Sequence, residues 1–111
     1  MSLVEKQWIF LKNVSKLINY AEEIGVVLTG GELYRTVEQQ KIHFDAGRSK
    51  TMKSNHMKRL AIDFNFFIDG ELVYDNKKIT ELGNFWKSLN PKNEWGGFWA
   101  FKDVPHFEML E

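Results

Sequence analysis

The sequence contains no cysteine, which excludes disulfide bonds and removes thiolates from the possible ligands of a metal site. It has only two prolines, no repeat, and no linker-like tract rich in proline or glycine. We therefore expect residues 1–111 to form one domain with a single core.

The sequence also lacks an excess of charge of either sign and any long apolar run. Lys plus Arg and Asp plus Glu both number 15, and this balance argues against nucleic acid as a partner. No segment approaches the roughly 20 apolar residues of a membrane span, so we expect no stable membrane association. No signal peptide is visible at the N-terminus, and we expect the protein to accumulate in the cytoplasm.

The first half of the chain predicts two helices separated by a short strand. Apolar residues recur at helical spacing from Val4 to about Ile24, before Gly25. They are Val4, Trp8, Leu11, Val14 or Ser15, Ile18 and Ala21. Residues 26–28 form a short apolar strand. A second helix is expected after Thr36, which forms a capping box with Gln39, and it ends near Gly47. The polar stretch 48–55 is predicted to be a loop.

The segment from Leu60 to Ile68 predicts a strand with two different faces. Its even positions are all large and apolar, whereas its odd positions include Asp63. Asp69 and Gly70 predict a hairpin that returns through residues 71–74. A third helix is expected over residues 80–89, and a final strand over 105–110. These elements predict an α+β fold with a small antiparallel sheet packed against about three helices.

Two imidazoles and one carboxylate form a possible ligand set for one divalent metal ion: His56, Asp63 and His106. In the predicted sheet, Asp63 and His106 lie on neighbouring strands, and His56 belongs to the loop that enters the first of them. Nitrogen and oxygen ligands of this kind suit Zn²⁺ best, and three of them leave a fourth position for water. Asp103 lies three residues before His106 and could act as the base for that water. We therefore expect a catalytic zinc site on the open face of the sheet.

Two spaced motifs resemble those of the M15 metallopeptidases. The first is Ser-x-His-x-x-x-x-Ala-x-Asp at residues 54–63, and the second is Trp-Gly-Gly at 95–97 followed by Asp-x-Pro-His-Phe at 103–107. The family includes D-alanyl-D-alanine carboxypeptidases and dipeptidases, and the L-alanyl-D-glutamate endopeptidases of phage endolysins. The resemblance covers residues 31–108 and implies a fold of the hedgehog/D-Ala-D-Ala peptidase type with one Zn²⁺.

The resemblance also implies roles for residues outside the ligand set. Arg35, in a Tyr-Arg-Thr motif, would stabilise the oxyanion or bind a substrate carboxylate, and Asp103 matches the family's base. Ser54 would orient the substrate or His56. Gln40 and Trp95 are further candidates for the substrate-binding wall.

Simpler interpretations of several residues stay open at this point. Arg35 could form a surface ion pair with Glu32 or Glu38. Residues 95–99 could form an aromatic core loop instead of a substrate wall. Glu108 shares the face of His106 and could be its hydrogen-bonding partner or a charge at the rim. His43 is expected to have no role.

One departure from the motif concerns the position of Arg59, where many relatives have glycine. Because glycine often supplies a positive φ, either the turn differs here or the glycine was never needed for its backbone conformation. Arg59 also belongs to a basic stretch that could meet the anionic cell wall or simply be solvated. The stretch consists of Arg48, Lys50, Lys53, Lys58 and Arg59.

These features predict a zinc-dependent peptidase that cleaves peptidoglycan stem peptides, as a phage or prophage endolysin of the L-alanyl-D-glutamate endopeptidase type. It would be a monomer that reaches the wall after a holin permeabilises the inner membrane. One alternative is a D-alanyl-D-alanine carboxypeptidase or dipeptidase, which an additional cation in the pocket would favour. Another is a non-catalytic module that binds zinc or wall peptide.

Overall fold

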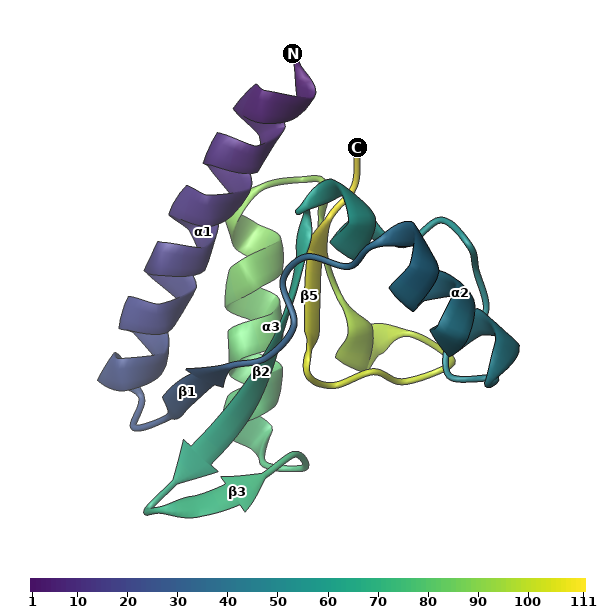
Figure 1. Cartoon of the computed structure of the whole chain (residues 1–111). Helices are drawn as coiled ribbons and strands as arrows, with labels where there is room; N and C mark the ends of the chain where they lie inside the picture. The colour runs from purple at the N-terminus through teal and green to yellow at the C-terminus, as the bar shows by residue number, and fades with distance from the viewer.

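The computed structural model describes residues 1–111, in which three α-helices pack with a five-stranded antiparallel sheet (Figure 1). The α+β class is therefore confirmed. The helices are α1 (Leu3–Glu23), α2 (Val37–Asp45) and α3 (Lys77–Leu89), with short 3-10 helices η1 (Asn55–Lys58) and η2 (Gly96–Phe98). The strands are β1 (Val27–Gly30), β2 (Ala61–Ile68), β3 (Glu71–Val73), β4 (Asn93–Trp95) and β5 (His106–Met109).

Strand β2 organises the sheet, whose order is β1-β2-β5-β4 with β3 paired to the far end of β2. Every pair is antiparallel, and Asp63 of β2 lies opposite His106 of β5. The register therefore places two sequence-predicted ligands side by side on one face of the sheet.

The opposite face of the sheet carries the core, which α1 and α3 cover. Helix α2 lies apart from them, on the other side of β5 in Figure 1. Trp86 of α3 is fully buried, and its ring forms edge contacts with Phe10 of α1 and Phe107 of β5. Its indole N–H donates to two main-chain carbonyls, at 3.1 Å to Glu94 and 3.0 Å to Glu108. This side chain ties both helices to the strand that bears His106.

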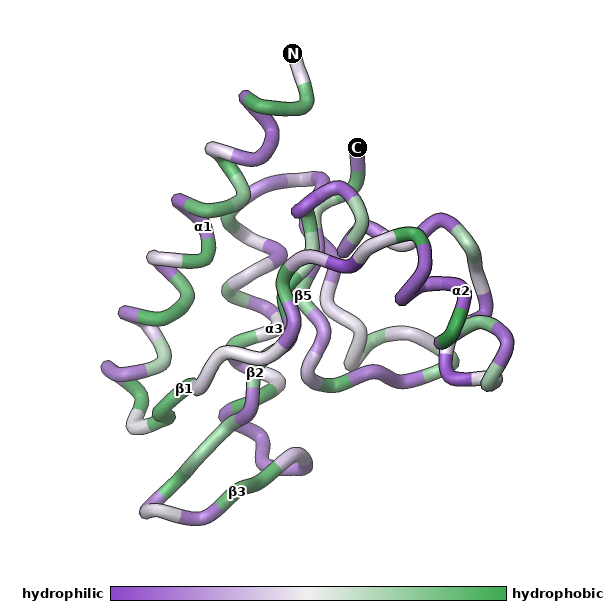
Figure 2. Tube along the Cα trace, in the orientation of Figure 1, coloured by the Kyte–Doolittle hydropathy of each residue, from purple (hydrophilic) through white to green (hydrophobic).

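The predicted first helix is confirmed, but most of the apolar stripe that indicated it does not face the core. Val4, Trp8, Leu11 and Ile18 are exposed, with 63% of Trp8 accessible to solvent. The buried face instead presents Phe10, Val14, Leu17 and Ala21 together with Asn13. Hydrophobic segments accordingly recur all along α1 in Figure 2. Two stripes at helical spacing predict the same helix, and the sequence pattern does not distinguish which one packs.

The other boundaries follow local chemistry. The capping box of Thr36 and Gln39 is present at the start of α2. Helix α3 begins three residues earlier than predicted, because the Asn76 side chain accepts from Lys78 N and caps it there. The Asp69-Gly70 hairpin is confirmed, with φ of 52° and 79° at its two turn residues. Strand β4 and the 3-10 helices were not predicted. None of the helices combines the length and apolar character needed to cross a bilayer.

Candidate metal centre

The side chains of His56, Asp63 and His106 converge on one point of the sheet's open face. Their ligand atoms all lie within 4.8 Å of one another. Asp63 Oδ1 is 3.4 Å from His56 Nε2 and 3.3 Å from His106 Nδ1. The convergence that strand pairing predicted is therefore present in the structure.

A hydrogen bond at the outer nitrogen of each imidazole fixes its orientation. His56 Nδ1 donates to Leu33 O at 3.0 Å, because a carbonyl can only accept. His106 Nε2 donates to Glu108 Oε1 at 2.6 Å. The two rings thus turn different nitrogens, Nε2 of His56 and Nδ1 of His106, toward Asp63. Histidine ligands of metal ions are usually held in this manner, so both rings are oriented before any ion binds.

Asp63 Oδ1 provides a direct test of whether the three residues fit a cation. This oxygen is buried and accepts no hydrogen bond of good geometry, although two imidazoles lie beside it. Buried acceptors are rarely left without a partner. A divalent ion among the two nitrogens and this oxygen would satisfy it, so the donor set and its burial fit such an ion.

The local electrostatics of the ion-free protein follow from the same contacts. Burial would raise the pKa of Asp63, but the two imidazoles outweigh it and hold this pKa well below its usual value. Burial would lower the pKa of His106, whereas Asp63 and Glu108 together raise it to about 9. The pKa of Asp103 is raised, chiefly by burial and in part by the nearby Asp63, against the opposing effect of His106.

Backbone contacts hold Asp103 beside the three converging side chains. Asp103 N donates to Gly96 O at 2.9 Å, and Asp103 O accepts from His106 N at 3.0 Å. Its carboxylate oxygen Oδ2 is 4.0 Å from His106 Nδ1, and the side chain is half exposed. Asp103 therefore borders the centre with a carboxylate that water and a ligand can reach.

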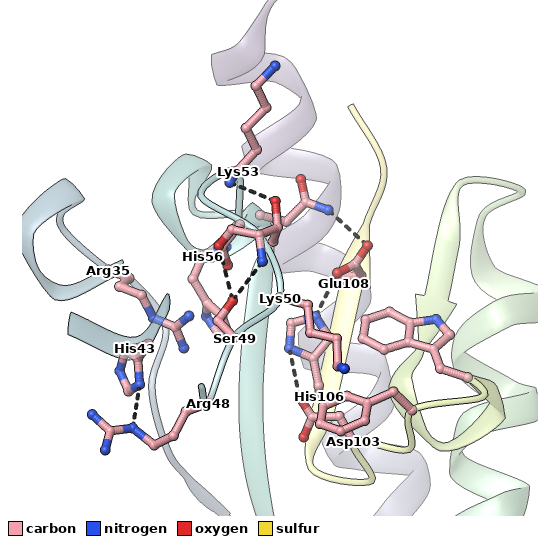
Figure 3. Close-up of a pocket in the computed structure, with 15 residues that line it drawn as sticks. Arg35, His43, Arg48, Ser49, Lys50, Lys53, His56, Asp103, His106 and Glu108 are labelled. Carbon is pink, nitrogen blue, oxygen red and sulfur yellow. Dashed lines mark hydrogen bonds and ion pairs between the residues drawn. The ribbon is translucent and has the colours of Figure 1, made fainter. Parts of the chain in front are cut away.

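The centre opens into a cavity of about 430 Å³ (Figure 3). Arg35, Ser54, His56, Asp103 and His106 all line it. Ser54 also caps η1, because its Oγ accepts from His56 N at 3.2 Å. Ser54 therefore contacts the backbone of His56, and its role in orienting the substrate or His56 stays a prediction.

Arg35 forms one of the ion pairs that the sequence suggested and also borders the cavity. Its guanidinium forms an ion pair with Glu32, and Nη1 donates to Gln40 Oε1 at 2.7 Å. Glu38 is not its partner. The side chain is only 12% exposed and still lines the cavity, so the pairing orients the guanidinium beside the site.

The structure does not bring Gln40 or Trp95 to the cavity wall. Gln40 is fully buried, and its Nε2 donates to Ser49 Oγ at 2.8 Å and to Thr51 O at 2.5 Å. Trp95 belongs to the core, where it stacks on Phe107 and donates to Val104 O at 2.8 Å. Gln40 thus connects Arg35 to the loop after α2, and Trp95 supports β5 from behind.

Several residues at the site carried no signal in the sequence. Leu33 contributes only its carbonyl, and no side-chain pattern marks such a contact. Phe101 lines the cavity as well, and so does Trp99 of the stretch 95–99, for which the sequence left a core loop and a substrate wall open; its ring is 5.1 Å from that of His106. His43, which was expected to have no role, also lines it. Glu108 is confirmed as the hydrogen-bonding partner of His106.

Arg59 adopts the left-handed conformation, with φ 56° and ψ 36°, and ends η1. The backbone at this position therefore has a positive φ, which arginine adopts in place of glycine. The guanidinium lies over the Tyr34 ring, 4.0 Å from its centroid. This cation–π contact compensates part of the backbone strain.

Comparisons with known proteins place the chain among peptidases. A model of the M15 peptidases described as D-alanyl-D-alanine carboxypeptidase matches residues 47–109. The L-alanyl-D-glutamate peptidase of Listeria phage A118 is 36% identical over 99 residues. The match covers 85% of this chain and 34% of the phage protein, so the chain spans about a third of that relative's length.

Two solved structures share the fold. The L-Ala D-Glu endopeptidase ChiX of Serratia marcescens has a TM-score of 0.71 at 24% identity, over 89% of this chain and 79% of its own. A mutant of the vancomycin resistance D,D-pentapeptidase VanY from a VanB-type cassette, solved in complex with Zn(II), has a TM-score of 0.62 at 17% identity. That match covers 92% of this chain and 71% of VanY.

Proposed function

Since the chain belongs to the M15 peptidase family, we propose that it is a zinc-dependent peptidase that cleaves peptidoglycan stem peptides between L-Ala and D-Glu. The observation that carries the proposal is the buried, unsatisfied Asp63 Oδ1 between two imidazoles whose outer nitrogens are already held. The choice of bond rests on the name of the phage relative and of ChiX.

His56 Nε2, His106 Nδ1 and Asp63 Oδ1 would hold the Zn²⁺. When bound, the ion lowers the pKa of a water ligand toward about 7 and polarises the scissile carbonyl. Asp103 would accept the proton of the attacking water and pass it to the leaving amine.

Arg35 stabilises the negative charge that develops on the carbonyl oxygen, or binds a substrate carboxylate. Glu32 and Gln40 hold its guanidinium at the edge of the cavity, so little further side-chain entropy is lost when a ligand binds there. Ser54 fixes the turn that presents His56.

The proposal is tested with purified protein, Zn²⁺ and isolated peptidoglycan, with the fragments identified by mass spectrometry. We expect fragments with newly exposed N-terminal D-Glu, and complete loss of their release with a chelator. Asp103→Asn should keep stoichiometric zinc and lose about 10²–10⁴-fold in turnover, whereas His56→Ala should lose the metal. Release of no fragment by the zinc-loaded protein, or equal release with chelator present, would refute the activity.

A D-alanyl-D-alanine carboxypeptidase is the second candidate, and one observation favours it. The cavity holds cations besides Arg35, as recognition of a free C-terminal carboxylate requires. Parallel assays on intact wall and on a short peptide ending in D-Ala-D-Ala separate the two. Release of D-Ala alone would select this candidate.

We further propose that the protein is a monomer of one domain that acts on the wall from the cytoplasmic side once a holin has opened the inner membrane. The phage origin of the relative supports this route. Light scattering on a sizing column should give the mass of one chain. Expression in a bacterium should cause lysis only when a holin is co-expressed.

A further inference from the structure

The loop between α2 and η1 places three cations at the cavity without acidic partners. Arg48, Lys50 and Lys53 all line the cavity, and none of them forms an ion pair with a carboxylate. Arg35, in contrast, is paired with Glu32. The loop therefore carries uncompensated positive charge at the mouth of the site.

Few negative charges in the cavity balance these cations. Its lining includes four Arg or Lys side chains but only two carboxylates, Asp103 and Glu108. Glu108 is already engaged, since its oxygens accept from His106 at 2.6 Å and from Asn55 at 2.8 Å. The loop side of the cavity therefore favours an anionic ligand.

Lys50 reaches from this loop across the cavity. Its Nζ lies 4.9 Å from the centroid of the Phe101 ring, which belongs to the opposite wall. Figure 3 draws the Lys50 side chain on the side that bears Asp103 and His106, apart from His43 and Arg48, whereas Lys53 extends away. The aromatic contact places the ammonium group against the wall formed by Phe101, and no carboxylate forms an ion pair with it.

Arg48 is held in position from α2. Its Nε donates to His43 Nδ1 at 3.1 Å, and the backbone N–H groups of Arg48 and Ser49 both donate to His43 O. Ser49 and Thr51 in turn accept hydrogen bonds from the buried Gln40. The loop is thus fixed to the same side chain that orients Arg35, which reduces the entropy cost of binding a ligand there.

We propose that Lys50, aided by Arg48 of the same loop, binds a carboxylate of the substrate other than the group being cleaved, and thereby selects acidic peptides. This inference rests on the proposed function and names a specificity determinant of the same site. Two sources supply such a carboxylate in a stem peptide: the α-carboxylate of γ-linked D-Glu, and the free C-terminus. Lys50 and Arg48 are specificity residues here and take no part in the proton transfer.

Three synthetic stem peptides test the proposal: one with both carboxylates free, one with the D-Glu α-carboxylate amidated, and one with the C-terminus amidated. For the zinc-loaded protein we expect amidation of one of the two to lower kcat/KM about three- to tenfold. The position at which amidation matters identifies the source. Lys50→Gln should lower kcat/KM for the free acid by the same factor and should cleave the free acid and that amide equally well. Lys50→Arg should keep the preference for the free acid.

Arg48→Gln should show a smaller loss of the same kind. Lys16→Gln, which removes an exposed lysine of α1 far from the cavity, is the matched control and should behave as wild type. Equal cleavage of all three peptides by wild type would overturn the proposal. A full preference for the free acid in the Lys50→Gln, Arg48→Gln double variant would do so as well.

Calorimetric binding of the same peptides separates this inference from the proposed function. If wild type cleaves none of them, the peptidase proposal fails. The proposal that Lys50 binds a carboxylate still holds in that case if wild type binds the free acid more tightly than its amide and Lys50→Gln does not. It falls if both proteins bind the two peptides equally.

Discussion

At the scale of single residues, the metal centre depends on side chains whose partners are not evident from the sequence. The ligand types and Asp103 could be predicted from motif spacing, because the side-chain alternation of β2 fixes the face of Asp63. The orientation of His56 could not be predicted, because it depends on a backbone carbonyl 23 residues earlier. The burial of Gln40 and Trp95 likewise depends on tertiary packing that their motifs do not encode.

Protonation of His106 should make the stability of the ion-free protein depend on pH. Its pKa is raised from 6.5 to about 9, so folding favours the protonated ring. The resulting stability is fully present below pH 6.5 and is lost as the pH rises to about 9. Denaturation in chelator should show this decline, and His106→Gln should reduce it. An unchanged slope in the variant would assign the decline to another group.

The free energy of unfolding of the wild type, with Arg59, should lie between those of the Arg59→Gly and Arg59→Ala variants. Arg59→Gly relieves left-handed strain of about 1–2 kcal/mol, while it loses a cation–π contact of about 0.5–1 kcal/mol at this exposed site. Arg59→Ala loses the contact and keeps the strain. Urea denaturation should therefore give the order glycine, arginine, alanine, from most to least stable. Alanine above arginine would show that the Tyr34 contact contributes nothing.

At the scale of elements, the strands and helices were mostly predictable, and the segment between β4 and β5 was not. Local signals such as the capping box and the Asp69-Gly70 turn act over a few residues. The segment 96–103, in contrast, takes its shape from the close approach of Gly96 to Asp103. No periodicity reveals a contact of that kind.

Gly96→Ala should displace Asp103 without removing the ligands. A Cβ at residue 96 would lie 2.2 Å from Asp103 O, so the backbone that carries the base must move. We expect a loss of kcat of tenfold or more, with zinc content unchanged in atomic absorption measurements. Gly30→Ala is the matched control, since nothing lies within 4 Å of the added atom. Full activity of Gly96→Ala would argue against Asp103 as the base.

At the scale of the whole molecule, the sheet separates two tasks. One face packs against α1 and α3 and provides the core, and the other bears the ligands in a polar cavity. The outer stripe of α1 remains exposed and plays no part in either. Which of two apolar stripes packs depends on the completed fold, so sequence periodicity could not settle it.

Because only the folded chain brings the three ligands together, zinc should stabilise the whole molecule. At a free zinc concentration 100 times its Kd, mass action adds about 2.7 kcal/mol to the free energy of unfolding. For a chain of this size that corresponds to a rise in Tm of roughly 10–20 °C. Calorimetric scans with zinc and with chelator measure it, and Asp103→Asn should retain the shift that His56→Ala abolishes. A Tm that zinc leaves unchanged would show that the folded state has no such site.

The register that places Asp63 opposite His106 also affects how mispaired strands are corrected during folding. If β5 paired with β2 in a register shifted by one residue, the His106 imidazole would enter the core and the Phe107 ring would face water. Such a chain would offer the ion two ligands in place of three and would hold it far more weakly. Zinc in the growth medium should therefore raise the yield of properly folded protein, because zinc binding shifts the equilibrium from mispaired chains toward the register that binds the ion.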